Sequence, residues 1–374
     1  MLHIGFITCE LTHRHGWARY STELIAHLHR EGVRVTVIAS CSSPTAFDFP
    51  VYPILPEVIT HCLPLRLLSV LPYARALLRN CDLLQVTLEP FAPLGVWAAG
   101  SRPLFLSVHG SYAALPQFKR FPLNHLYSQS FRRVQAVCVS RYTAEVYKRV
   151  MPGACPLVVN NGVDVARFAQ LMPPSEPKHG PIVLAVGAVK ARKGILELVS
   201  AMAVVRRSIP NVQCVIIGSL STEAAYVAQV RSAIASLRLQ DSIRLLGHVP
   251  EETLLGWYSV ADVFVLPSMN TGWKFEGFGL VYLEASAAGL PVIGTRGCGA
   301  EDTIDDGVTG VLVSQERIAD ELPAALMCLL SDPALRERMG AAGRAKAQMY
   351  TWERVAQHMM MLYDNPLPQK AGTP

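Results

Sequence analysis

The 374-residue chain is 51% hydrophobic and 17% charged, which is typical of a globular protein and excludes an intrinsically disordered one. No apolar run approaches the roughly 20 residues of a membrane-spanning helix. The N-terminal segment reads directly as a strand, without the basic region of a signal peptide, and the nine cysteines are scattered rather than paired, so we expect a cytoplasmic protein with reduced thiols.

The net charge of +5 is unevenly distributed along the chain. Residues 1–172 carry 16 Lys and Arg against 9 Asp and Glu, whereas the rest of the chain carries 18 against 20. A basic first half is consistent with an anionic partner or a membrane surface, and equally with a solvated basic face. The basic residues form no block and do not interleave with aromatic residues, so we expect no nucleic-acid partner.

Short apolar strands alternate with helical patterns in the first half, which indicates a parallel sheet with helices on both faces. A helix is predicted over 16–31. The predicted strands are 3–8, 34–40, 83–87, 103–110, 136–140 and 156–164. Residues 170–181, "QLMPPSEPKHGP", are rich in Pro and charge and are predicted to be a linker.

A second series of the same kind follows the linker. Its predicted strands are 182–188, 212–219, 243–249, 263–268, 291–295 and 310–313. Its predicted helices are 194–208, 222–237, 251–260, about 279–288, 319–331, 333–349 and a last helix that begins near Thr351. We therefore predict an α/β protein of two doubly wound parallel-sheet domains, with ligands bound beyond the carboxyl ends of the strands, in a cleft between the halves.

Several cofactor classes are not expected. Neither half carries G-x-G-x-x-G after its first strand, which argues against a nicotinamide or flavin dinucleotide. No cluster of Asp, Glu or His has metal-ligand spacing, so we expect no bound metal.

A basic turn, "VGAVKARKG", follows the first strand of the second half. It gathers Lys190, Arg192 and Lys193 just before a helix that is predicted to begin at about Gly194. Arg provides a planar fork and Lys a point charge, and both suit a diphosphate at the start of a helix. A solvated basic turn is the alternative interpretation.

Two glutamates flank a small turn in "KFEGFGLVYLEA". Glu276 precedes the predicted helix and Glu284 lies within it. Eight residues on one helix turn by about 80°, so the two carboxylates would contact different parts of one ligand rather than act as a facing acid and base. Alternatively, Glu276 is a capping residue of the loop and Glu284 is a surface charge of the helix.

The turn between these glutamates contains two glycines. Gly277 and Gly279 allow the backbone to approach a ligand closely. The amides of Phe278, Gly279 and Leu280 would then form a second anion-binding helix start.

His109 follows a predicted strand of the first half and precedes Gly110. At this position it would face the cleft, although a lone histidine at a strand end is also compatible with a structural role. His13 and His15 in the first loop are weaker candidates for the same cleft. No nucleophile–base pair that would support covalent catalysis is evident.

These motifs together resemble retaining glycosyltransferases of family 4 (glycosyl transferases group 1), which have the GT-B fold and an E-x7-E signature. The resemblance covers about 350 residues. It rests on motifs that occur in the family's order: "HRHGWARYSTELIAHLHREGVRVTVIA", "VHGSY", "VSRYTAEVY", "NNGVDVARF", "VGAVKARKGILELVSAM", "IRLLGHVPEETLLGWYSVADVFVLPS", "EGFGLVYLE" and "GLPVIGTRGCGAEDTIDDGVTGVLV".

The resemblance implies roles for the charged residues of the second half. Glu276 would hydrogen-bond the hydroxyls of the donor sugar, and Glu284 would bind the ribose hydroxyls of the nucleotide. Arg192 and Lys193 would neutralise the leaving diphosphate. Many members have an arginine directly after the glycine of the first strand here, whereas this chain has Ala188, and Arg192 is expected to substitute for it.

Further roles are implied in both halves. The backbone at His248 and Val249 would face the nucleotide base. Gly16 would approach the diphosphate, and His109 would reach the donor sugar near the reacting carbon.

The resemblance also implies the domain organisation and the function. Residues 1–172 would form the acceptor-side domain, with the C-terminal helix, about 355–374, packed back on it, and 173–354 would bind the donor. The reaction would move a sugar from a UDP- or GDP-sugar to a sugar or lipid-linked acceptor, without metal or cofactor. An epimerase or hydrolase on this fold, a pyridoxal-dependent phosphorylase, and a non-catalytic nucleotide-sugar-binding protein are the alternatives.

Peripheral contact with the inner face of the membrane is a further expectation for the basic half. Residues 63–79 and 124–135 mix apolar and basic residues at near-helical spacing, as in helices that rest on anionic lipid. Ordinary packing helices are the alternative, and Pro72 interrupts the first segment.

Overall fold

The computed structural model describes residues 1–58, 63–169 and 178–366. The chain divides into two compact units. The first unit contains Met1–Gly162 and the described residues from Trp352 onward, and the second unit is Val163–Thr351. We expected these boundaries at residues 172 and 354. The second unit instead begins at Val163, whose N–H donates to Tyr350 O at 2.7 Å and so connects the start of the unit to its end. Residues 170–177 of the predicted linker lie outside the described residues.

The first unit is built on a seven-stranded, all-parallel sheet with strand order β3-β2-β1-β4-β5-β6-β7. Its interior strand β1 is buried along its whole length, as expected for a sheet that is covered on both faces. The strands are β1 (His3–Ile7), β2 (Arg34–Ser40), β3 (Val51–Leu55), β4 (Leu83–Val86), β5 (Leu104–Val108), β6 (Gln135–Cys138) and β7 (Leu157–Val158).

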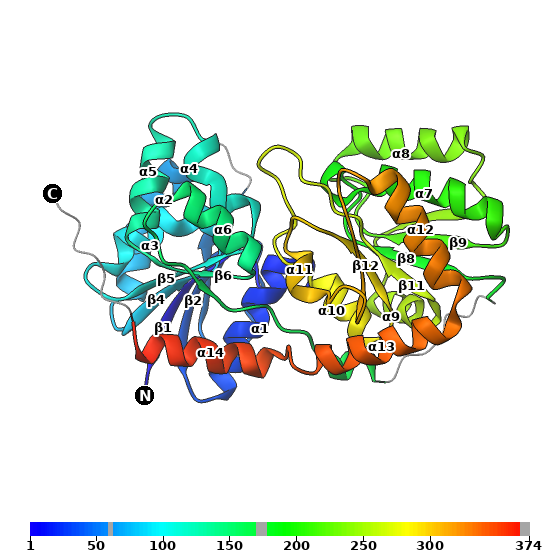
Figure 1. Cartoon of the computed structure of the whole chain (residues 1–374). Helices are drawn as coiled ribbons and strands as arrows, with labels where there is room; N and C mark the ends of the chain where they lie inside the picture. The colour runs from blue at the N-terminus through cyan, green and yellow to red at the C-terminus, as the bar shows by residue number, and fades with distance from the viewer. Residues whose placement is uncertain (59–62, 170–177, 367–374) are drawn as a thin grey trace. The chain divides into compact units, whose positions relative to one another are not determined.

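Helices connect these strands, and the last helix of the chain joins them. The helices are α1 (Gly16–Arg30), α2 (Leu63–Leu77), α3 (Ala92–Ala99), α4 (Leu115–Phe118), α5 (Leu123–Arg132), α6 (Arg141–Val150) and α14 (Trp352–Asp364), with 3-10 turns η1 (Glu89–Phe91) and η2 (Ser111–Ala114). Helix α14 lies alongside α1 (Figure 1), where the Tyr20 and Trp352 rings meet edge to face at 6.0 Å. Residues 367–374 of the predicted last helix lie outside the described part of the chain.

Two strands of the first unit differ from the prediction. Strand β3 was not predicted, because Pro53 interrupts its pattern, but β3 is the edge of the sheet, where a missing N–H is tolerated. The strand predicted over 156–164 is only the two-residue β7, at the opposite edge.

The second unit contains a six-stranded, all-parallel sheet with strand order β10-β9-β8-β11-β12-β13. Every residue of β8 is buried. The strands are β8 (Ile182–Val186), β9 (Gln213–Ile217), β10 (Ile243–Gly247), β11 (Val263–Val265), β12 (Val292–Thr295) and β13 (Gly310–Val313).

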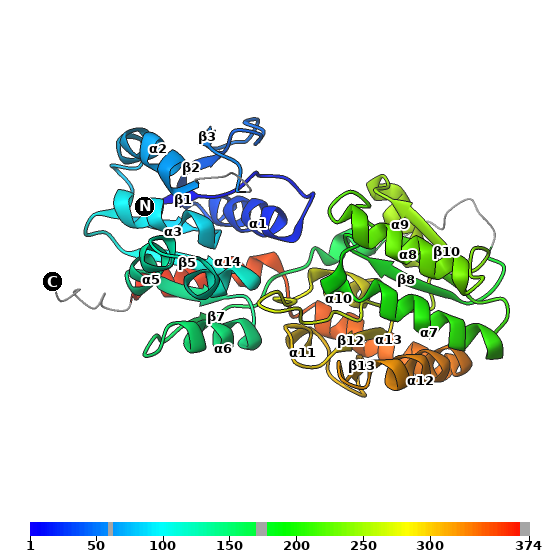
Figure 2. The ribbon, with the colours of Figure 1, turned by 90° about the horizontal axis from the view of Figure 1, so that it is seen from above.

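The helices of this unit confirm the predicted series. Helices α7 and α12 pack side by side (Figure 2). The helices are α7 (Ile195–Ser208), α8 (Ala224–Ser236), α9 (Glu251–Val260), α10 (Leu280–Ala287), α11 (Ala300–Thr303), α12 (Ile318–Ser331) and α13 (Pro333–Ala347), with 3-10 turns η3 (Val165–Phe168) and η4 (Ala191–Lys193).

No helix within the described ranges is both long and apolar enough to cross a membrane. The eight described cysteines are free thiols, and Cys62 lies outside the described residues.

Candidate active site

The candidate site of the second unit lies where the strand order of its sheet reverses. From β8 the chain builds one edge through β9 and β10, and then returns to place β11, β12 and β13 on the other side of β8. The carboxyl ends of β8 and β11 therefore lie side by side at a topological switch point, where open α/β sheets bind ligands. The turn after β8 meets the loop after β11, and Met269 N–H donates to Arg192 O at 2.9 Å.

Gly194 makes this close approach of the two loops possible. It adopts a left-handed conformation with φ +64°, and an added Cβ would lie 1.8 Å from Pro267 O. A residue with a side chain would be both strained and in collision with the backbone there. The basic turn is thus held directly against the β11 loop.

Glu276 receives both predicted phosphate-binding side chains of the basic turn. Arg192 Nη1 donates to Glu276 Oε2 at 3.0 Å, and Lys193 Nζ donates to the same oxygen. Ser268 Oγ donates at 3.3 Å from the end of the β11 strand region. Glu276 is 7% exposed and Lys193 is 8% exposed, so the interpretation of this segment as a solvated basic turn is wrong for Lys193.

The charges of this cluster determine its protonation. Burial alone would raise the pKa of the Glu276 carboxyl, but the positive charges of Lys193 and Arg192 outweigh it and lower this pKa to about 2. Burial and repulsion by Arg192 and Lys193 lower the pKa of Lys190 to about 8, against the attraction of Glu276 and Glu223. The two carboxylates are outnumbered by the basic side chains near them, which are Lys190, Arg192, Lys193 and Lys274, the last at 3.9 Å from Glu223. The cluster is therefore cationic at neutral pH and suited to a polyanion.

The glycine turn leads from Glu276 into α10. Gly279 is the N-cap of this helix with φ +81°, and an added Cβ would lie 2.4 Å from the Tyr282 ring. Gly277 O lies only 2.0 Å from where a Cβ on Gly299 would be, so the neighbouring loop packs against the turn backbone. Phe278 is buried and Leu280 opens the helix. The anion-binding role of these amides stays a prediction.

Glu284 lies inside α10 and has its own set of partners. Its side chain is 6% exposed, so the surface-charge interpretation is wrong. Tyr258 OH donates to Glu284 Oε2 at 3.2 Å, and Arg167 Nη1 lies 3.9 Å from Oε1. The two glutamates therefore present separate carboxylates with cations of different elements beside them, although Glu276 lies before α10 and only Glu284 is on the helix.

The predicted base-facing segment follows the edge strand β10. His248 is exposed and Val249 is half-buried, and they lead through Pro250 to the first residue of α9, Glu251. Their contact with a nucleotide base stays a prediction.

In the first unit, His109 is held at two atoms by the segment that follows β4. Its ring Nε2 lies 2.8 Å from Thr87 O, and its backbone N–H donates to Glu89 Oε1 at 2.8 Å. Tyr20 packs edge to face on the ring, with centroids 4.6 Å apart. Strands β4 and β5 are neighbours, so their carboxyl ends bring these residues together.

This environment keeps the His109 ring neutral. Burial lowers the pKa of His109 to about 4, although the bond to Thr87 O opposes the shift. Because a carbonyl only accepts, Nε2 carries the proton, and Nδ1 is an acceptor. His109 is therefore suited to accept a hydrogen bond from a hydroxyl and not to act as a general acid at neutral pH.

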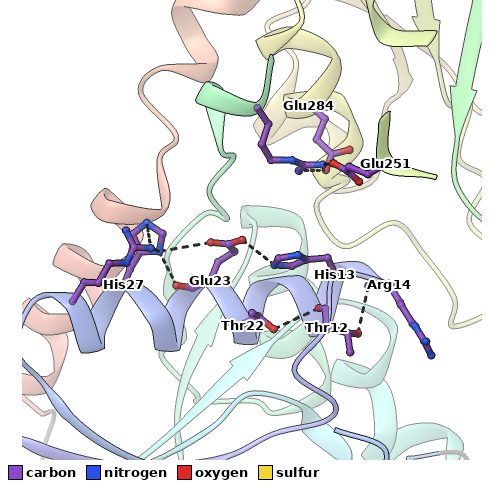
Figure 3. Close-up of polar contacts among 10 residues, drawn as sticks. Thr12, His13, Arg14, Thr22, Glu23, His27, Glu251 and Glu284 are labelled. Carbon is purple, nitrogen blue, oxygen red and sulfur yellow. Dashed lines mark hydrogen bonds and ion pairs between the residues drawn. The ribbon is translucent and has the colours of Figure 1, made fainter. Parts of the chain in front are cut away.

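The first loop of this unit is stabilised by histidine–carboxylate pairs. His13 Nε2 lies 3.1 Å from Glu23 Oε1 (Figure 3), and His15 Nε2 lies 2.6 Å from Glu10 Oε1. Gly16 is the first residue of α1. The proposed approach of Gly16 to a diphosphate stays a prediction.

Sequence reasoning missed several residues of these clusters, among them Ser268, Tyr258, Arg167 and Glu89. Ser268 ends the segment "VFVLPS", so its place at a strand end was a usable signal. Tyr258 and Glu89 lie in apolar segments that carry no such signal. No group of three or more His, Cys, Asp or Glu side chains that could hold a metal ion occurs within the described part of the chain.

Comparison with known proteins identifies the family. The family description "Glycosyltransferase Family 4" matches residues 14–167, and "Glycosyl transferases group 1" matches residues 169–346. The chain is 32% identical over 275 residues to the "GDP-mannose-dependent alpha-(1-6)-phosphatidylinositol monomannoside mannosyltransferase" of Mycolicibacterium smegmatis, which covers 68% of each chain.

Solved structures show the same fold. A sucrose-phosphate synthase from Thermosynechococcus elongatus superposes with a TM-score of 0.78 at 23% identity, over 97% of this chain and 98% of that one. Anabaena HepE in complex with UDP and glucose gives 0.79 at 19% identity, over 97% and 100%. These structures are GT-B glycosyltransferases, as predicted for the two-sheet architecture. The chain thus belongs to glycosyltransferase family 4 (glycosyl transferases group 1), has the GT-B fold and is a glycosyltransferase.

Proposed function

We propose that this glycosyltransferase moves a sugar from a nucleoside-diphosphate sugar, a UDP- or GDP-sugar, to an acceptor hydroxyl with retention of the anomeric configuration. The observation that carries the proposal is the buried Glu276 carboxylate, held by Arg192 and Lys193 at the switch point between β8 and β11. Donated hydrogen bonds anchor one of its oxygens, and an ionised carboxylate can accept further bonds from sugar hydroxyls.

The same cluster supports departure of the nucleoside diphosphate. As the bond from the sugar carbon to phosphate oxygen breaks, negative charge grows on the diphosphate and the sugar becomes oxocarbenium-like. Preorganised cations at that point lower the barrier without having to reorganise. The acceptor oxygen then bonds to the same face of the sugar, and its proton passes to the leaving phosphate. This scheme requires neither a metal nor a protein base.

The proposal predicts turnover in excess chelator and a retained product. We expect transfer from a panel of UDP-, GDP- and ADP-sugars to be measurable in EDTA, and the anomeric coupling in the product's NMR spectrum to match that of the donor. An inverted product, or activity restored only by Mg²⁺ or Mn²⁺, would contradict the mechanism. Release of free sugar whether or not acceptor is present would indicate a hydrolase instead.

We further propose that the acceptor is carried by a lipid and that the first unit rests on the inner face of an anionic membrane. Helix α2 exposes Leu65, Leu68 and Tyr73, at 67%, 47% and 67%, next to the exposed Arg66 and Arg75. Apolar side chains that can enter the headgroup region beside arginines that attract anionic lipid are the features of an interfacial helix. The M. smegmatis relative is named for a phosphatidylinositol monomannoside acceptor.

Co-sedimentation with phosphatidylglycerol vesicles tests this surface. We expect binding at low salt, a loss of at least about fivefold when both Leu65 and Leu68 are replaced by Gln, and weaker binding at high salt because exposed charges are screened. Val204→Gln, an exposed position of α7 in the second unit, is the control and should bind normally. Equal binding of the double variant, or no wild-type binding to these vesicles, would refute the membrane surface.

A further inference from the structure

We propose that Arg167 is a positioning residue for nucleotide binding, which holds the Glu284 carboxylate oriented toward the ribose hydroxyls. This inference rests on the proposed function, in which the donor is a nucleoside-diphosphate sugar, and on the role of ribose binding that the family resemblance implies for Glu284. Arg167 lies near the end of "NNGVDVARF", far from both glutamates in sequence. It is brought to Glu284 because η3 packs against α10 within the second unit.

The turn that carries Arg167 is rigidly placed. The Asp164 side chain caps η3 by accepting from Ala166 N–H at 3.1 Å. The Phe168 ring meets the Tyr258 ring edge to face, with centroids 5.5 Å apart. The Arg167 guanidinium in turn lies 5.4 Å from the centre of the Phe168 ring. The position of Arg167 is therefore fixed by the aromatic residue next to it and by the tyrosine that also bonds Glu284.

Arg167 lies near two carboxylates, and it forms a hydrogen bond with one of them only. It donates to Glu251 Oε1 at the start of α9, whereas its Nη1 lies 3.9 Å from Glu284 Oε1, beyond hydrogen-bond distance. Figure 3 shows the Glu251 and Glu284 carboxylates pointing toward one another. Glu251 thus anchors the guanidinium, which presents its positive charge to Glu284 without a short bond to that oxygen.

This charge is what a buried, diol-binding carboxylate requires. The Glu284 side chain is only 6% exposed, and Tyr258 supplies a hydrogen bond but no charge. A buried carboxylate without a cation is strongly disfavoured. Burial alone would lower the pKa of Arg167, but the Glu284 and Glu251 carboxylates raise it, so the guanidinium stays charged. An ionised carboxylate only accepts hydrogen bonds, which matches two ribose hydroxyls that donate.

The experiment compares nucleotides with and without the ribose hydroxyls. Dissociation constants for UDP and GDP and for their 2′,3′-dideoxy forms are measured by calorimetry on the full chain. For the wild type we expect the better-binding ribose nucleotide to be preferred over its dideoxy form by roughly tenfold or more, since the dideoxy form lacks both hydroxyls that would donate to the charged carboxylate. If the wild type shows no such preference, the ribose-binding role of Glu284 fails and this inference fails with it, whereas the chelator and product assays test the proposed function separately.

The variants separate positioning from folding. Arg167→Ala should reduce the ribose preference at least about fivefold while changing affinity for the dideoxy form less than about twofold. Arg167→Lys, which keeps the charge, should retain most of the preference. Arg317→Ala removes an exposed arginine paired with Glu321 elsewhere in this unit and should leave both affinities unchanged.

Two results would overturn the inference while leaving the proposed function intact. One is a wild type that prefers ribose together with an Arg167→Ala variant that keeps this preference. The other is an Arg167→Ala variant that weakens the ribose and dideoxy forms equally, which would indicate a general structural role. If Arg167→Ala does not fold, Arg167→Gln takes its place, because it keeps much of the length of the side chain without the charge. Arg167→Gln should lose the ribose preference in the otherwise wild-type chain and cause no further loss in the Glu284→Gln background.

Discussion

Replacement of Glu276 by alanine is expected to lower the rate of sugar transfer by about 100- to 1,000-fold, with folding retained. The carboxylate is the shared acceptor for Arg192, Lys193 and Ser268, so its loss removes the proposed sugar contact and releases the two cations from their positions. Steady-state kinetics with the donor identified by the nucleotide-sugar panel measures the effect.

Two further variants make the result specific. Glu276→Gln keeps the shape of the side chain but not its charge, and should be nearly as inactive, because a neutral amide holds the paired cations poorly. Glu321→Ala removes a carboxylate of α12 that pairs with Arg317, the residue just before this helix, and should leave turnover unchanged. Turnover within about threefold of the wild type in Glu276→Ala would remove this residue from the site.

The pH dependence of stability provides an independent check on the same carboxylate. Because the folded-state pKa of Glu276 is lowered from 4.5 to about 2, its ion pairs contribute stability that is fully present above about pH 4.5 and is lost as the pH falls toward 2. The contribution is on the order of 3 kcal/mol. The difference in free energy of unfolding between wild type and Glu276→Gln should therefore shrink below pH 4.5, and a constant difference would contradict the lowered pKa.

The sequence identified the charged residues of this cluster but not the contacts among them. Residues 192 and 193 and residue 276 are each recognisable as loop residues beyond apolar strands. Their contact depends on β11 returning to pair with β8 rather than with β10. Local patterns show that strands alternate with helices, but strand order is set by which faces pack together over the whole unit.

The partners of Glu284 show a second limit of sequence reasoning. Arg167 was included in a family motif without a role, because its neighbours in sequence do not reveal that it faces Glu284, a carboxylate far away in the chain. Tyr258 has the position of an apolar residue in the pattern of α9, and only the structure shows that its hydroxyl donates to Glu284 of α10. Buried polar groups of this kind are dictated by the need to satisfy a distant charge, which local periodicity does not record.

Lys193→Ala is expected to reduce kcat by about 1,000-fold while changing the KM for the donor far less. In the ground state Lys193 is already engaged with Glu276, so it adds little to donor binding. As the diphosphate departs, its growing charge attracts the ammonium more strongly, and an interaction that strengthens in the transition state acts on kcat. Lys193→Met keeps the volume of the buried side chain and should be equally inactive, which separates charge from packing.

An Arg192 variant and a double variant test whether the effect on kcat is specific to the contact between Lys193 and Glu276. The Arg192 side chain is 22% exposed, against 10% for Lys193, so water screens the interaction of Arg192 with the diphosphate more strongly. Arg192→Ala should therefore reduce kcat only about tenfold. Lys193 and Glu276 act through one contact. The kcat of the Lys193→Ala, Glu276→Ala double variant should therefore lie within about threefold of the kcat of the slower single variant. Fully multiplicative losses would show that the lysine and the carboxylate serve separate steps, and the diphosphate would then have to draw its stabilisation from the α10 amides and Lys190 instead.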